Sequence, residues 1–153
     1  MTEKTSRSEL TPHRLIAAIM LGLLIIYNII CQIKGAEIQI GLAEQERIFI
    51  RTLFYAAAIA LFPFSTLLRH ILLRLNQTMP GDNPAKSRYL MTTIVTLVCI
   101  EIVGIFGLIM FILGDGYNTL YIFTALGALG VFLHRPREQE YREIIEALKT
   151  RQL

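Results

Sequence analysis

Long runs of apolar residues without any charged side chain divide this sequence. They cover residues 15–33, 52–68, 89–100 and 116–133. Glu101 interrupts the third run, which resumes at once and continues to Gly114. A helix needs about 17–25 apolar residues to cross about 30 Å of hydrocarbon. The pattern therefore predicts an all-α integral membrane protein with four transmembrane helices in antiparallel hairpins, at about residues 15–33, 48–70, 88–113 and 117–134.

Polar segments between the runs predict where the chain turns. Residues 35–41 are expected to form an external loop, and the Pro, Gly and Asn residues of 76–84 favour a second loop. The triplet 114–116 is so short that the third and fourth helices must be antiparallel neighbours. Pro63 is expected to lie inside the second helix, since a proline usually kinks a membrane helix without ending it.

The two ends of the chain are polar. Residues 1–13 are predicted to be a cytoplasmic arm, 14–134 the membrane domain and 135–153 a cytoplasmic tail. Apolar positions of the tail recur at helical spacing, at Tyr141, Ile144, Ile145 and Leu148. The tail is therefore expected to form a short amphipathic helix. Two placements stay open for it: on the membrane surface or a partner, or folded back on its own chain.

Composition and charge agree with a membrane protein and give it an orientation. Only 18% of the residues are charged, against about a quarter in soluble domains, and the mean hydropathy is +0.51. Lys and Arg gather in the arm, in residues 69–88 and in the tail, whereas residues 114–116 have none. The positive-inside rule then places both termini and the middle loop in the cytoplasm, and a bacterial inner membrane is the expected location. The net charge of +3 reflects this orientation, and nothing in the sequence indicates a nucleic-acid partner.

Glu101 is the one ionisable residue deep within a predicted span. It lies about 12 residues from each end of its segment, roughly 18 Å from either surface at 1.5 Å per residue. A charged carboxylate there costs several kcal/mol, so we expect it to be protonated or paired. Three interpretations stay open: it carries a proton or a small cation such as sodium, it is a protonated structural group, or it faces a locally thinned bilayer. Its candidate hydrogen-bond partners in the structural case are Asn28, Ser65, Thr66 and Thr124.

Small residues mark the surfaces at which helices are expected to pack closely, within the chain or between copies. Lipid tails are as apolar as leucine, so association depends on close backbone approach. The expected contact residues are Ala56, Ala60, Gly104, Gly107, Gly127 and Gly130.

Other kinds of site have little support in the sequence. The cysteines Cys31 and Cys99 lack the companions that a disulfide or a zinc site needs. His13, His70 and His134 fall at predicted cytoplasmic boundaries and have no ligand spacing, so no metal site is expected. The tyrosines, Tyr27 among them, are interpreted as interfacial anchors. No cofactor motif and no nucleophile–base pair appears, so we do not expect an enzyme.

Residues 101–110, EIVGIFGLIM, resemble the carboxylate-bearing helix of the rotary ATP synthase proteolipid, the ring-forming c subunit. In that family an acidic residue precedes a Gly-aromatic step and a run of Leu, Ile, Val and Met. The segment from Arg74 to Pro84 matches the polar loop that joins the family's two helices, and the resemblance covers about residues 43–113. It implies a proteolipid-like hairpin, an oligomeric assembly, and Glu101 as the ion-carrying carboxylate. The family's Gly-x-Gly helix is replaced by alanines here, and two further spans flank the hairpin.

Two functions therefore compete. The first is a proteolipid-like, oligomeric membrane protein in which Glu101 binds a proton or cation. The second is a non-catalytic structural or accessory subunit of a larger membrane complex, in which Glu101 is only a protonated, hydrogen-bonded group.

Overall fold

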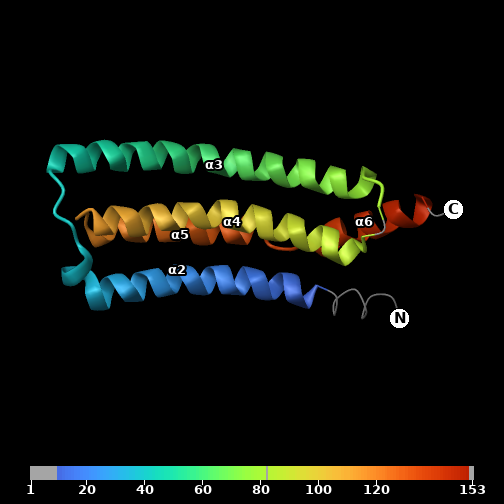
Figure 1. Ribbon diagram of the computed structural model, residues 1–153, viewed down its shortest axis with the longest axis horizontal. Coiled ribbons are helices and arrows are strands. Elements are labelled where there is room, and N and C mark those ends of the chain that lie inside the picture. Colours follow the sequence, from blue (N-terminus) through green and yellow to red (C-terminus); the bar gives the residue numbers. More distant parts are fainter. Residues whose placement is uncertain (1–9, 82, 152–153) are drawn as a thin grey trace.

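The computed structural model describes residues 10–81 and 83–151, and helices make up nearly all of this part of the chain. The helices are α2 (Thr11–Ile38), α3 (Glu44–Thr78), α4 (Ala85–Ile112), α5 (Tyr117–Leu133) and α6 (Glu138–Arg151). They run side by side along one axis, except α6, which lies at the end where α2 begins (Figure 1). The expected arm falls largely on residues 1–9, outside the described residues.

Helices α2, α3 and α4 are each long and apolar enough to cross a membrane. Helix α5 has 17 residues, about 25 Å at 1.5 Å per residue, and it passes the same test only together with α6, from which it is bent by 41°. Large apolar side chains of the outer helices are exposed, such as Ile25 at 60% and Ile59 at 73%. These features confirm an all-helical protein in which three helices, or four if α5 and α6 count as one bent span, are long and apolar enough to cross a membrane.

The helices lie where the apolar pattern places them, and several extend beyond the predicted spans. Helix α3 continues through Pro63, as expected, but it ends only at Thr78, inside the second predicted loop. Helix α4 begins at Ala85, three residues before the predicted span. Helix α2 also continues to Ile38, through part of the predicted external loop. The reason is Gly35, which packs against the rings of Phe111 and Tyr117 while remaining helical.

Helix α4 is the centre of the bundle. It packs against α2, α3, α5 and α6, and its buried residues lie on several sides of the helix. Figure 1 shows α4 and α5 together between α3 and α2. Glu101 belongs to this central helix, and its side chain is buried within the single chain.

The glycines expected at helix contacts do lie there. Gly104 faces the Leu24 side chain, Gly127 lies against the same leucine, and Gly130 lies against Ile100. A Cβ atom on Gly107 would lie 2.8 Å from the Cβ atom of Phe123. Gly-to-Leu and Gly-to-backbone contacts of this kind let α4 approach α2 and α5 closely.

The two alanines expected at contacts within the chain or between copies do not form contacts within the chain. Ala56 and Ala60 are exposed in the single chain, and the buried alanine of α3 is Ala58. The apolar sequence of α3 is nearly uniform around the helix here, so spacing alone did not identify the face that meets α4.

The tail forms the predicted helix and folds back on its own chain. Tyr141 and Ile144 of α6 are buried against Leu10 and Tyr89, with Ile145 and Leu148 packed beside them. Of the two open placements, the structure shows the second.

Candidate functional site

Glu101 is enclosed in the middle of the bundle. Its side chain is 5% exposed, and neither carboxyl oxygen has a hydrogen-bond partner among the described residues. The Tyr27 hydroxyl of α2 lies close enough to interact with it, without the alignment of a formed hydrogen bond. No ion pair in the described part of the chain includes Glu101. The carboxyl group therefore lies near the Tyr27 hydroxyl and has no ion-pair partner among the described residues.

The four polar residues expected as partners of Glu101 are bonded elsewhere. Asn28 Nδ2 donates to Thr124 Oγ1 at 2.8 Å, which joins α2 to α5. Ser65 and Thr66 lie beside His134, at 3.1 and 3.4 Å from its Nε2 atom. Sequence reasoning assigned Tyr27 to the membrane interface and missed it as the neighbour of Glu101. Its position near the middle of α2 was the available signal.

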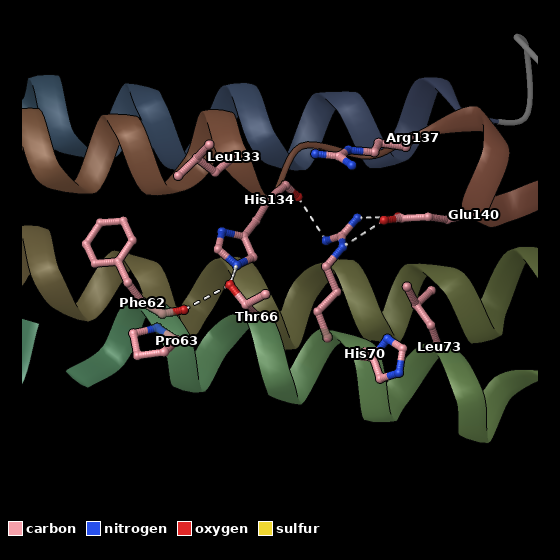
Figure 2. Close-up of a pocket in the computed structure, with 10 residues that line it drawn as sticks. Phe62, Pro63, Thr66, His70, Leu73, Leu133, His134, Arg137 and Glu140 are labelled. Carbon is pink, nitrogen blue, oxygen red and sulfur yellow. Dashed lines mark hydrogen bonds and ion pairs between the residues drawn. The ribbon is translucent and has the colours of Figure 1, made fainter. Parts of the chain in front are cut away.

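A second polar centre lies at the end of the bundle where α6 packs, and Arg69 of α3 organises it. Arg69 is 7% exposed and forms an ion pair with Glu140, with Nη2 2.6 Å from Oε2 (Figure 2). Its Nη1 atom donates to the carbonyl of His134 at 2.9 Å and to Thr96 Oγ1 at 3.3 Å. Each nitrogen of the guanidinium is engaged, which satisfies a buried cation that would otherwise be costly.

Tyr89 completes this network from α4. Its hydroxyl donates to Glu140 Oε2 at 2.8 Å and accepts from the backbone N–H of Arg137 at 2.8 Å. The network therefore joins α3, α4, α6 and the segment between α5 and α6. None of these pairings was predicted, because the partners lie between 20 and 71 positions apart in the sequence.

His134 is buried beside this network, one residue beyond α5. Its Nδ1 atom lies 2.9 Å from the carbonyl of Gly130, which only accepts hydrogen bonds, so Nδ1 carries a proton. In the neutral imidazole, Nε2 then accepts from the hydroxyl of Ser65 or Thr66 (Figure 2). The sequence suggested no nucleophile–base pair, yet Ser65 and His134 are in contact. Ser65 is fully buried, which makes the contact a link between α3 and α5.

The three histidines of the predicted boundaries do not form one cluster. His13 packs against the ring of Tyr89, with centroids 5.0 Å apart, and His134 is buried between α3 and α5. His70 lines a cavity of about 480 Å³ between α3 and the segment that joins α5 to α6. Among the residues that the structure describes, no three His, Cys, Asp or Glu side chains come together as a metal site.

Comparisons of the chain with protein-family models, with characterised proteins and with solved structures give no match.

Proposed function

We propose that this chain is a four-span membrane protein with cytoplasmic termini, in which Glu101 binds and releases a proton. The observation that carries the proposal is the carboxyl group of Glu101, 5% exposed and without a hydrogen-bonded or charged partner among the described residues. A carboxylate in such a position costs several kcal/mol, whereas the protonated acid carries no charge. Proton binding therefore accounts for an acid at this depth.

A proton fits this position better than a metal cation. Hard cations such as Ca²⁺ or Mg²⁺ are held by about six oxygen ligands, and smaller numbers leave them poorly coordinated. Around Glu101 the described residues supply one hydroxyl group, that of Tyr27, beside the carboxyl oxygens. A proton needs one oxygen atom, so the proton is the ion that we propose for this group.

The four-span orientation rests on the ends of the helices. Arg69, Arg135 and Arg137 lie together at the end where α6 packs, which the positive-inside rule assigns to the cytoplasm. At the opposite end, Arg47 and Arg51 face Asp115, with Arg51 3.2 Å from its Oδ1 atom. Helix α5 connects the two ends and is the proposed fourth span.

The resemblance to the rotary proteolipid adds a proposed assembly. In that assembly several copies surround a common axis, and Glu101 is the carboxylate that carries the proton. Within one chain, Tyr27 of α2 already lies beside this carboxyl group, and Glu101 is 5% exposed. Proton exchange therefore requires a movement of α2 relative to α4.

Carbodiimide labelling tests the proton site. Dicyclohexylcarbodiimide reacts with protonated carboxyl groups in apolar surroundings, so we expect an adduct on the α4 peptide that contains Glu101. The adduct should decrease as the pH of the membrane suspension rises, and mass spectrometry of the digested protein measures it. Glu101→Gln should lose this adduct, while Glu140→Gln, which removes a paired carboxylate, should keep it.

Proton flux separates a working acid from a buried structural one. Wild-type protein in vesicles that enclose a pH-sensitive dye should allow proton flux, and Glu101→Gln should abolish it. Labelling at Glu101 with equal flux in both proteins would contradict proton transfer. Absence of the adduct in folded wild-type protein would contradict a protonated carboxyl.

The second candidate function is an accessory subunit of a larger membrane complex. The observation that favours it is the exposed pair Ala56 and Ala60, one turn apart on α3, because small residues at this spacing let another helix approach closely. The native mass of the complex extracted in mild detergent distinguishes the two. A single copy bound to other proteins favours the accessory subunit, and many copies of this chain favour the proteolipid-like assembly.

A further inference from the structure

The cavity at the α6 end of the bundle has walls of two kinds. Phe62, Pro63 and Leu133 form its apolar end, which lies toward the middle of the bundle. Arg69, His70 and Arg137 lie toward the end where α6 begins. Figure 2 shows Phe62, Pro63 and Leu133 toward one end and His70 and Arg137 toward the other, with α3 on one side and the segment joining α5 to α6 on the other. Leu73 and Glu140 also line this second end. The cavity therefore changes along the bundle axis from an apolar end to an end that holds its charged groups.

The basic groups of this cavity differ in what they can still bind. Glu140 and backbone carbonyls already engage Arg69. By contrast, no ion pair or side-chain hydrogen bond engages the guanidinium of Arg137 or the ring of His70 within residues 10–81 and 83–151. Both residues are exposed to the cavity. One acid, Glu140, faces the two arginines, so the basic end keeps an excess of positive charge.

The position of the cavity decides the kind of ligand. It begins beside the apolar part of α3 and ends at Arg69 and His70, where the charge-free run of this helix stops. That level of a membrane protein on the cytoplasmic side meets the phosphate groups of anionic lipids, and basic pockets between helices bind them there. Guanidinium groups also match phosphate oxygens in geometry and charge.

We propose that this cavity binds an anionic phospholipid, with its phosphate at Arg137 and His70 and an acyl chain against Phe62, Pro63 and Leu133. The Thr66 hydroxyl lines the cavity between the two ends and is available to the glycerol region (Figure 2). The proposal goes beyond proton binding at Glu101 and does not depend on it, because the two sites share no residue. It rests on the proposed topology, which puts this end of the bundle at the cytoplasmic membrane surface.

Native mass spectrometry of the delipidated protein in detergent tests the proposal. With added phosphatidylglycerol we expect one tightly bound lipid, and with phosphatidylcholine a weaker complex. Arg137→Gln should weaken phosphatidylglycerol binding roughly five-fold, since one basic group near a lipid surface contributes about 1 kcal/mol. Arg137→Gln with His70→Gln should weaken it further.

Arg135→Gln is the matched control. Arg135 is two positions away and exposed, and its guanidinium lies over the ring of Phe132 at 4.2 Å and not in the cavity. It should bind phosphatidylglycerol as the wild type does, and so should Glu101→Gln. The Arg137 side chain has no bond within the described fold, so its replacement should leave the thermal unfolding temperature unchanged.

Three results would overturn the proposal. They are equal binding of the two lipids, equal loss in Arg135→Gln and Arg137→Gln, and displacement of phosphatidylglycerol by inorganic phosphate. The last result would assign the basic end to a soluble phosphate compound. Loss of lipid binding in Glu101→Gln would show that the two sites are linked.

Discussion

Replacing Arg69 with methionine is expected to lower the free energy of unfolding by about 3–5 kcal/mol, the usual cost of removing one partner of a buried ion pair. The side chains of Arg69 and Glu140 are 8% and 17% exposed, so little water is present to replace the lost partner. The substitution also leaves the carbonyls of His134 and Arg135 without their donor. Unfolding in mixed detergent micelles, followed by circular dichroism, measures the loss.

Arg142→Met provides the control for this prediction. Arg142 pairs with Glu138 one turn earlier in α6, at 2.6 Å, but its side chain is 52% exposed. Exposed helix pairs contribute about 0.3–0.5 kcal/mol, so this variant should change stability by less than about 1 kcal/mol. Equal small losses in both variants would show that water screens the Arg69–Glu140 pair.

A double variant identifies how the loss arises. Arg69→Met with Glu140→Leu removes the unpaired acid and fills the space with apolar atoms, so it should recover part of the stability lost in Arg69→Met. Recovery should be incomplete, because the His134 carbonyl still lacks its donor. A double variant less stable than Arg69→Met would contradict an uncompensated buried carboxylate as the cause.

The Arg69 network explains why the cavity beside it exists. By engaging the carbonyls of His134 and Arg135, Arg69 directs the chain from α5 into α6 and leaves a space in front of α3. The same ion pair neutralises Arg69 and Glu140 and leaves Arg137 as the unengaged cation at the cavity. Arg69 therefore stabilises the fold, and Arg137 beside it is the arginine that we propose for lipid binding.

The helices could be predicted from the sequence because their signal is local. Charge-free runs and the Pro and Gly residues between them located α4 and α5 to within a few residues, whereas α3 extends eight residues beyond the end of its predicted span. Gly35 misled the interpretation of α2, because a glycine that packs against rings looks the same in sequence as one that ends a helix. The placement of α6 stayed open for the same reason: its apolar face indicated a contact but not its partner.

The sites were less predictable because they depend on the rotation of whole helices. The depth of Glu101 followed from its position in the run, and its burial in the bundle agrees with that depth. The residue beside Glu101 could not be predicted in the same way. Consecutive residues differ by about 100° around a helix, and Tyr27 is adjacent to Asn28, the expected partner. Asn28 faces Thr124 of α5, and Tyr27 faces α4. The Arg69–Glu140 pair joins residues 71 positions apart, for which one sequence holds no signal.

Gly107→Ala is expected to destabilise the bundle by about 1–3 kcal/mol, the usual cost of overpacking. The added Cβ atom would lie 2.8 Å from the Cβ atom of Phe123 and 3.3 Å from the carbonyl oxygen of Leu120. Both atoms are fixed by the backbone of α5, so no side-chain rotation relieves the contact. Gly107→Leu should separate α4 from α5 and lower the yield of folded protein.

Two other glycines show whether the loss of stability comes from the overpacked contact at Gly107 or from replacing any helical glycine with alanine. Gly22→Ala meets nothing within 4 Å in α2, so it should be neutral or stabilise by up to about 1 kcal/mol through its better helix propensity. Gly104→Ala meets only the end of the flexible Leu24 side chain, so its cost should fall between those of the other two. Unfolding of the three variants in mixed micelles gives this order. If Gly107→Ala were as stable as Gly22→Ala, α4 and α5 would have room to separate, and close contact at Gly107 would not be what holds these two helices together.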